Sequence, residues 1–149
     1  MKELQGRARA DLDVAPAECY ALLAAVERYP SWFEFVRRVD VLEPERNGTP
    51  GLARAEVHVE QSPFGQDFEL FMAVRTEPPV SVLLTRLPSG PSDPDRLELI
   101  WRVAGDASTL LELEFDAAAS FVPGFLPVGD AGDAMARAAI EAARAALRR

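Results

Sequence analysis

The chain has 149 residues, of which 48% are hydrophobic and 27% charged, a composition that excludes a disordered chain and fits one folded domain over residues 1–149. The formal net charge is −8 at pH 7 and no basic stripe is visible, so we expect no nucleic-acid partner. A lone cysteine, Cys19, excludes an intrachain disulfide, and no apolar run has the length of a signal peptide or a membrane span. We therefore expect a cytoplasmic protein without integral membrane association.

Residues suited to metal binding or nucleophilic catalysis are scarce. His58 is the only histidine, which rules out any site that needs two imidazoles. Neither Cys19 nor any serine lies in a nucleophile motif, and the chain has no phosphate-binding glycine loop and no CxxC pair. We expect neither a metal nor a cofactor.

The chain begins with a strand followed by two short helices. Residues 4–14 alternate small or apolar side chains with charged ones, which predicts a strand with one buried face. A helix begins at 15–18, with Pro16 in its first turn, where a missing N–H costs nothing. The segment 29–32 ends this helix, and a second short helix is predicted over 32–35.

The middle of the chain is a run of strands, and the end is a helix. Six further strands are predicted from apolar alternation between turn signals, over 36–43, 52–61, 67–76, 80–87, 97–103 and 109–117. These short strands favour an antiparallel meander. An apolar loop leads into an alanine-rich helix over 130–149, whose only large apolar residues are Met135, Ile140 and Leu147. Because an alanine face against a curved sheet leaves space, a ligand cavity is predicted there.

Several local sequences, in this order, carry a family resemblance. They are Val14-Ala15-Pro16-Ala17 at the first helix, Tyr29-Pro30-Ser31-Trp32 followed by Val39-Asp40-Val41-Leu42, Arg75-Thr76-Glu77-Pro78-Pro79, and Trp101 before Gly105. The chain resembles the START-like (SRPBCC) superfamily, which includes polyketide cyclases, aromatases and lipid-transfer domains. The resemblance implies an α+β helix-grip fold. In it, a curved seven-stranded antiparallel sheet wraps around a long C-terminal helix, with two short helices after the first strand.

The resemblance also implies an apolar cavity between the sheet and the C-terminal helix. The residues expected to line it are Trp32, Phe35, Phe71, Arg75, Arg86, Trp101, Phe121, Phe125 and Met135. Phe121 and Phe125 belong to the loop before the last helix, where they either form a lid or cap an ordinary core.

Arg75 and Arg86 are the candidate catalytic residues. They align with pocket arginines of the polyketide aromatase/cyclases, whose planar donors would polarise a ketone or hold an enolate. Alternatively, both are solvated arginines at strand ends. The chain departs from the aromatase/cyclases at Val36, where a pocket tyrosine is expected, and this weakens the expectation of cyclase chemistry.

Two registers compete for the strand over 67–76. Periodicity buries Phe68, Leu70, Met72 and Val74, whereas the resemblance points Phe71 and Arg75 inward. A slip of one residue moves every side chain to the other face, so only one register holds without a bulge. We favour the inward Phe71 and Arg75. Apolar groups on both faces would also suit a homodimer, with a partner subunit on the convex face.

Three hypotheses for function follow. The first is binding of a small-to-medium hydrophobic molecule, lipid-like or polyketide-like, in the internal cavity. The second is an aromatase/cyclase-type enzyme that guides aldol cyclisation and dehydration in the same cavity. The third is a protein-interaction module without a ligand. The residues do not identify the ligand.

Overall fold

Seven strands form one antiparallel sheet in the order β1-β7-β6-β5-β4-β3-β2. The computed structural model describes residues 2–61, 64–119 and 131–149. The elements are β1 (Lys2–Leu12), α1 (Pro16–Ala24), the 3₁₀-helix η1 (Val26–Ser31), β2 (Val36–Glu43), β3 (Gly51–Gln61), β4 (Phe64–Glu77), β5 (Ser81–Arg86), β6 (Arg96–Gly105), β7 (Thr109–Ala119) and α2 (Ala131–Leu147). The helix-grip α+β architecture predicted from the sequence is confirmed.

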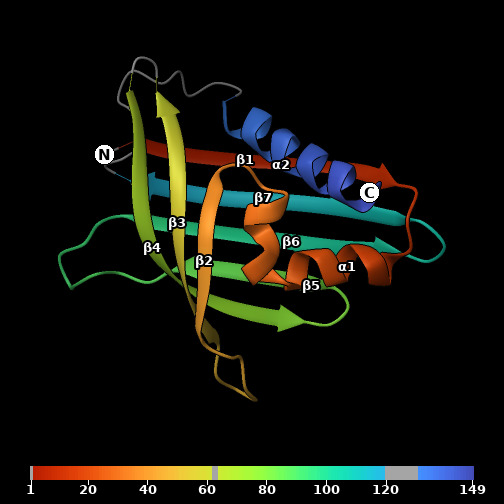
Figure 1. The fold of residues 1–149 in the computed structure, drawn as a ribbon, viewed down its shortest axis with the longest axis horizontal. Helices are drawn as coiled ribbons and strands as arrows, with labels where there is room; N and C mark the ends of the chain where they lie inside the picture. Colours follow the sequence, from red (N-terminus) through yellow and green to blue (C-terminus); the bar gives the residue numbers. More distant parts are fainter. Residues whose placement is uncertain (1, 62–63, 120–130) are drawn as a thin grey trace.

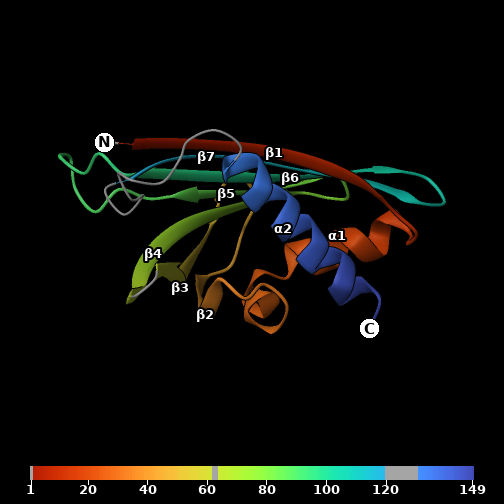
Figure 2. The same ribbon diagram turned by 90° about the horizontal axis from the view of Figure 1, so that it is seen from above.

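The sheet bends so that β2, β3 and β4 cross β5, β6 and β7 on the side that carries both helices (Figures 1 and 2). The bend runs along β4, which is 14 residues long. Residues 64–74 of β4 pair with β3, but only residues 72–77 pair with β5. Because the two ends of β4 have different neighbours, the sheet can turn along this strand and enclose one face.

The enclosed, concave face is defined by rows of residues that lie opposite one another. Val74 of β4 pairs with Leu84 of β5, Leu84 with Leu99 of β6, and Leu99 with Phe115 of β7. Neighbouring positions on the same face form the buried core with residues of α1 and α2. Apolar alternation with a period of two therefore runs across the sheet and turns one side toward the helices.

The register that we favoured for β4 is wrong. Met72 is 7% exposed, whereas Phe71 is 41% exposed, and Arg75 is exposed as well. The ladders to β3 and β5 show no register shift, so no bulge reconciles the two expectations. Leu70, Met72 and Val74 lie inward because they bury a continuous apolar row against the core, which Phe71, Ala73 and Arg75 would not.

The second short helix also differs from its prediction. It is η1, which ends at Ser31, and residues 32–35 are not helical. The backbone oxygen of Tyr29 accepts the N–H groups of Trp32 at 3.1 Å and of Phe33 at 2.7 Å, which closes the turn. The chain then extends directly into β2, so the aromatic residues of this segment lie on a tight turn.

Helix α2 packs mainly on β1, and less on β7 and α1. A Cβ built on Gly132 would lie 1.8 Å from the backbone oxygen of Gln5, so only glycine allows the helix to approach β1 this closely. The Asp133 Oδ1 atom accepts the backbone N–H of Arg7 at 3.0 Å and thereby caps part of the sheet edge. These contacts bring the first turn of α2 against β1 and fix the position of the helix on this side of the sheet.

Candidate functional site

An aromatic cluster joins η1 to the middle of β6. It consists of Tyr29, Trp32, Phe33, Phe35 and Trp101. The ring of Trp32 is central: its centroid lies 5.0 Å from that of Tyr29, 5.4 Å from that of Phe33 and 6.3 Å from that of Trp101. Three residues predicted for the site, Trp32, Phe35 and Trp101, thus belong to one connected group.

Burial decreases along this cluster from the core outward. Trp101 and Trp32 are buried, whereas Phe33 and Phe35 are half-buried. Phe35 contacts Phe33 edge-on at 5.8 Å, and its backbone oxygen accepts the N–H of His58 from β3 at 2.8 Å. The cluster therefore extends from the centre of the core toward the strands β2 and β3.

The polar side-chain atoms inside the aromatic cluster differ in their hydrogen bonding. The Tyr29 hydroxyl donates to the backbone oxygen of Leu23 at 2.6 Å, and burial raises the pKa of Tyr29 well above its usual range. The indole Nε1 atoms of Trp32 and Trp101 are buried without a hydrogen-bond partner in the part of the chain that the structure describes. The Trp101 indole beside the Tyr29 hydroxyl offsets part of this rise in the pKa of Tyr29.

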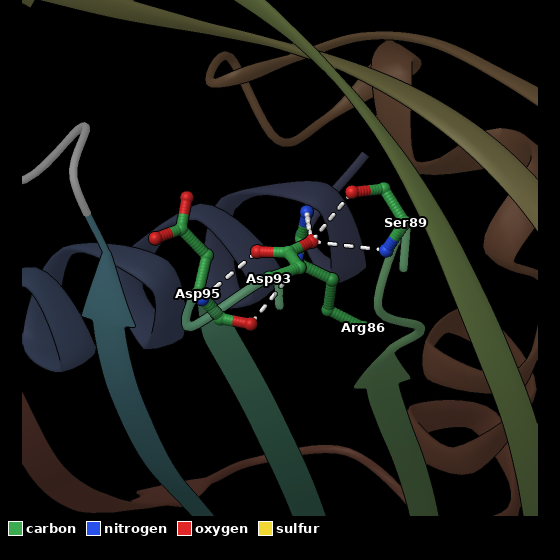
Figure 3. A network of polar contacts seen from close by, with 4 residues as sticks. All are labelled: Arg86, Ser89, Asp93 and Asp95. Carbon is green, nitrogen blue, oxygen red and sulfur yellow. Dashed lines mark hydrogen bonds and ion pairs between the residues drawn. The ribbon is translucent and has the colours of Figure 1, made fainter. Parts of the chain in front are cut away.

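Arg86 lies at the end of β5 on the concave face, opposite Met72. Its side chain is 12% exposed, and that of its partner Asp93 is 9% exposed. Arg86 Nη2 donates to Asp93 Oδ2 at 2.8 Å, and Nη1 donates to the backbone oxygen of Asp95 at 2.8 Å (Figure 3). The charge of this candidate catalytic arginine is therefore already compensated by a carboxylate.

Asp93 is the centre of this network. Its carboxylate also accepts the backbone N–H and the hydroxyl of Ser89, each at 2.9 Å, and the N–H of Asp95 at 3.0 Å. The Arg86 guanidinium, followed by the donors of Ser89 and Asp95, holds the pKa of Asp93 well below its usual range. The network fixes the loop between β5 and β6 against the end of β5.

Apolar side chains on the concave face are only partly buried toward one end of the sheet. They are Val39, Val57, Phe68, Leu97 and Leu99. We call these five residues, from β2, β3, β4 and β6, the concave apolar surface. Single exposed apolar groups are ordinary, but a set that faces the interior of a curved sheet forms a surface on which an apolar molecule can be buried.

Other predicted site residues lie elsewhere. Arg75 and Phe71 are on the outer face of β4, and Met135 is an exposed residue of α2. Phe121 and Phe125 lie outside the described residues. The structure thus brings Trp32, Phe35 and Trp101 together and separates Arg75 from Arg86.

A small hollow of about 150 Å³ lies between the end of α1, the start of η1 and the β2–β3 hairpin. Val26, Val41, Ala53 and Val74 contribute to its wall, and no residue of the aromatic cluster does. Sites for drug-sized ligands measure roughly 300–1,000 Å³, so this hollow suits at most a molecule of the size of benzene.

The sequence reasoning missed Tyr29, Phe33 and Asp93. Four aromatic residues within 29–35 were a signal for the first two. For Asp93 the only signal was a loop rich in proline, serine and aspartate, which does not identify the partner of Arg86.

The described residues include potential metal ligands and one thiol, Cys19. Among residues 2–61, 64–119 and 131–149, no three His, Cys, Asp or Glu residues form a group that could hold a metal ion. Burial raises the pKa of the Cys19 thiol to about 11, so this residue is an uncharged part of the core at neutral pH. No helix in the described part of the chain is long and apolar enough to cross a membrane.

Comparisons with known proteins agree with this fold. The sequence matches the family model described as "Polyketide cyclase / dehydrase and lipid transport" over residues 12–148. The chain belongs to this family. No functionally curated protein matches the sequence.

Solved structures of START-like proteins superpose on almost the whole chain. A START superfamily protein from Mycobacterium smegmatis has a TM-score of 0.74 at 17% identity, over 97% of each chain. The Zhui aromatase/cyclase from Streptomyces sp. R1128 has a TM-score of 0.68 at 16% identity, over 99% of this chain and 95% of that one. Human STARD10 has a TM-score of 0.71 at 12% identity, over 97% of this chain and 63% of that one. At these identities the similarity concerns the fold alone.

Proposed function

We propose that this protein binds a small-to-medium hydrophobic molecule between the curved sheet and its C-terminal helix. The observation that carries the proposal is the concave apolar surface, which is only partly buried although it faces the interior of the fold. Burial of apolar area releases about 25 cal/mol per Å², so such a surface favours an apolar occupant. Membership of a family whose description includes lipid transport supports the same function.

The position of the helix gives the second line of support. Because α2 packs on β1 and β7, its main contacts lie at one side of the sheet. Figure 2 shows α2 on the same side as β2, β3 and β4, which curve away from the plane of β1 and β7. Space for a ligand would then arise from sheet curvature, since the alanine face of the helix is used for close contact.

The geometry gives less support to an aromatase/cyclase. Arg75 lies on the outer face, and the guanidinium of Arg86 already binds Asp93 and the backbone of Asp95. The two candidate arginines of the second hypothesis therefore lie on opposite faces of the sheet. The concave apolar surface likewise favours a ligand-binding role over a module that only contacts proteins.

The test is a titration with N-phenyl-1-naphthylamine, a neutral apolar dye whose fluorescence rises when it leaves water. We expect saturable binding, weakened about tenfold in Phe68→Gln because apolar contact is lost. The matched control is Phe71→Gln, which alters a phenylalanine on the opposite face of the same strand and should leave dye affinity unchanged. Leu97→Gln on β6 should act like Phe68→Gln.

Circular dichroism of each variant establishes that the fold is retained. Native mass spectrometry of protein purified from its own cells should show a co-purified apolar molecule. Absence of saturable dye binding, or equal losses in Phe68→Gln and Phe71→Gln, would contradict the proposal.

A further inference from the structure

The hollow between α1, η1 and the β2–β3 hairpin lies apart from the concave apolar surface, none of whose five residues contributes to its wall. Its volume is about 150 Å³, and Val26, Val41, Ala53 and Val74 make much of its wall apolar. Val41 is 48% exposed, so the hollow is open to solvent beside β2. An engineered apolar cavity of about 150 Å³ binds benzene, and the hollow therefore has room for one small apolar group.

Three carboxylates surround this apolar wall. Glu27 belongs to η1, Glu43 ends β2, and Glu45 lies in the connection to β3; all three are exposed. We call these three residues the acidic rim. Among the described residues of the wall, none is Lys, Arg or His. The hollow is therefore apolar inside and negatively charged at its opening.

The charge of the acidic rim is not compensated by a cation of the described residues. Arg28 and Arg46 follow Glu27 and Glu45 directly in the chain, yet neither forms an ion pair with the rim. The ion pairs present in the described ranges involve other carboxylates. A positive charge from outside the chain would thus meet an unneutralised site.

One carboxylate of the acidic rim is fixed in position. Both oxygens of Glu45 accept hydrogen bonds from Thr76 of β4, from its backbone N–H at 2.8 Å and from its hydroxyl at 2.6 Å. These donors are uncharged, so they orient the carboxylate and leave its negative charge in place. Burial raises the pKa of Tyr20 beside Thr76, and the negative charges of Glu45 and Glu77 add to the rise.

A cation with an apolar body matches both parts of this site. The rim carboxylates do not form a group that could hold a metal ion in the described part of the chain, which disfavours a bare cation. An anion would be repelled, and a neutral molecule would gain only from contact with the wall. An organic ammonium ion gains from burial of its apolar end and from the negative charge at the opening.

We propose that this hollow is a second binding site, which takes a small primary amine in its protonated form. The apolar end of the amine lies against Val26, Val41 and Val74, and the ammonium group lies at the acidic rim. This site is independent of the hydrophobic binding proposed for the concave apolar surface.

Three matched probes test the selectivity of the site. They are benzylamine, which is cationic at neutral pH; benzyl alcohol, a neutral molecule of the same size; and phenylacetate, an anion. We expect benzylamine to bind about fivefold more tightly than benzyl alcohol, because exposed ion pairs each contribute little, and phenylacetate to bind most weakly. The preference for benzylamine should disappear between about 0.01 M and about 1 M ionic strength, as screening shortens the reach of the charges.

Methyl signals in a ¹H–¹³C spectrum locate the bound amine. Benzylamine should shift the signals of Val26, Val41 and Val74, which line the hollow. The signals of Val57, which belongs to the concave apolar surface, should stay in place.

A pair of double variants tests the role of the acidic rim. Glu27→Gln with Glu43→Gln should lower affinity for benzylamine about fivefold and leave affinity for benzyl alcohol unchanged. Both positions are exposed, so the fold should be retained. The matched control is Glu34→Gln with Glu69→Gln, which removes the same charge at two exposed positions outside the wall and should preserve the preference for benzylamine.

The proposal would be overturned by equal affinity for the three probes or by equal losses in the two double variants. It would also be overturned if benzylamine caused no saturable shift, or shifted Val57 in place of Val41. These outcomes are separate from the dye titration of the concave apolar surface, which depends on Phe68 and Leu97.

Discussion

Arg86 and Asp93 show how a partner changes the chemistry of a residue. An arginine in a dry site is an obvious electrophile for a ketone, but this one donates to Asp93 and to the backbone of Asp95. Removing the carboxylate would leave a guanidinium with little solvent around it. The pair therefore acts first as a stabiliser of the loop between β5 and β6.

Asp93→Asn should lower the free energy of unfolding at pH 7, and the difference should shrink as the solution is acidified below about pH 4. Because the pKa of Asp93 is lower in the folded than in the unfolded protein, its stabilisation is complete above the unfolded value, about 4. It decreases as the pH falls below that value and is lost only when the pH reaches the depressed pKa of the folded protein. Urea unfolding of both proteins at pH 7 and near pH 3 measures this.

The control for that experiment is Asp106→Asn, an exposed position between β6 and β7, which should change stability little at either pH. An equal loss of stability in Asp93→Asn at both pH values would show that the carboxylate charge is not responsible.

Among the elements, β4 is the one whose orientation was hardest to predict. It carries large apolar side chains at Phe68, Leu70 and Met72, and also at Phe71 on the other face. Both faces therefore satisfy the hydrophobic pattern in part. Pairing with β3 on one side and β5 on the other determines which face of β4 is buried, because the inward residues of both neighbours are opposite Leu70, Met72 and Val74.

Met72→Ala should destabilise the protein by about 2–5 kcal/mol, because it opens a cavity in the core. Phe71→Ala removes a larger side chain that is 41% exposed, and should cost less than about 1 kcal/mol. Chemical unfolding of the two variants compares the two faces of one strand directly. A larger loss for Phe71→Ala would mean that the outer face is covered, for example by a second subunit.

At the scale of the whole molecule, the core depends on contacts between distant parts of the chain. The aromatic cluster joins η1 to β6, and α2 closes on β1 at the opposite end of the sequence. Ion pairs such as Arg102–Glu114 and Arg96–Asp116 lie on the exposed outer face, where such pairs contribute little. Apolar burial between these distant segments holds the molecule together.

If residues 1–149 form one cooperative domain, all probes of unfolding should agree. Tryptophan fluorescence reports only on the aromatic cluster, because Trp32 and Trp101 are the two tryptophans of the chain. Far-UV circular dichroism reports on the helices and the sheet. The two thermal transitions should coincide at one midpoint, and two distinct midpoints would contradict a single domain.

The amino-acid pattern alone was enough for the order of the elements, and the resemblance of several local sequences to START-like proteins supplied the fold family. A period of two in seven segments and an alanine-rich end are local properties of the chain, and turn residues mark where each strand stops. The family resemblance named Trp32, Phe35 and Trp101 among the residues expected to line a cavity, and the structure joins these three in the aromatic cluster. Their contact follows from the fold, which the sequence predicted.

Tertiary contacts alone determined which face of β4 is buried, what neutralises Arg86, and which polar atoms of the aromatic cluster lack a partner. The burial of β4 and the surroundings of the aromatic cluster depend on segments that are far apart along the chain, whereas Asp93 lies in the loop that directly follows β5 and depends on how that loop folds back on Arg86. A period of two offers two faces, and only the summed burial of seven paired strands selects one of them. The contact between Trp32 and Trp101, and the burial of their indole nitrogens, likewise arise only once η1 and β6 meet.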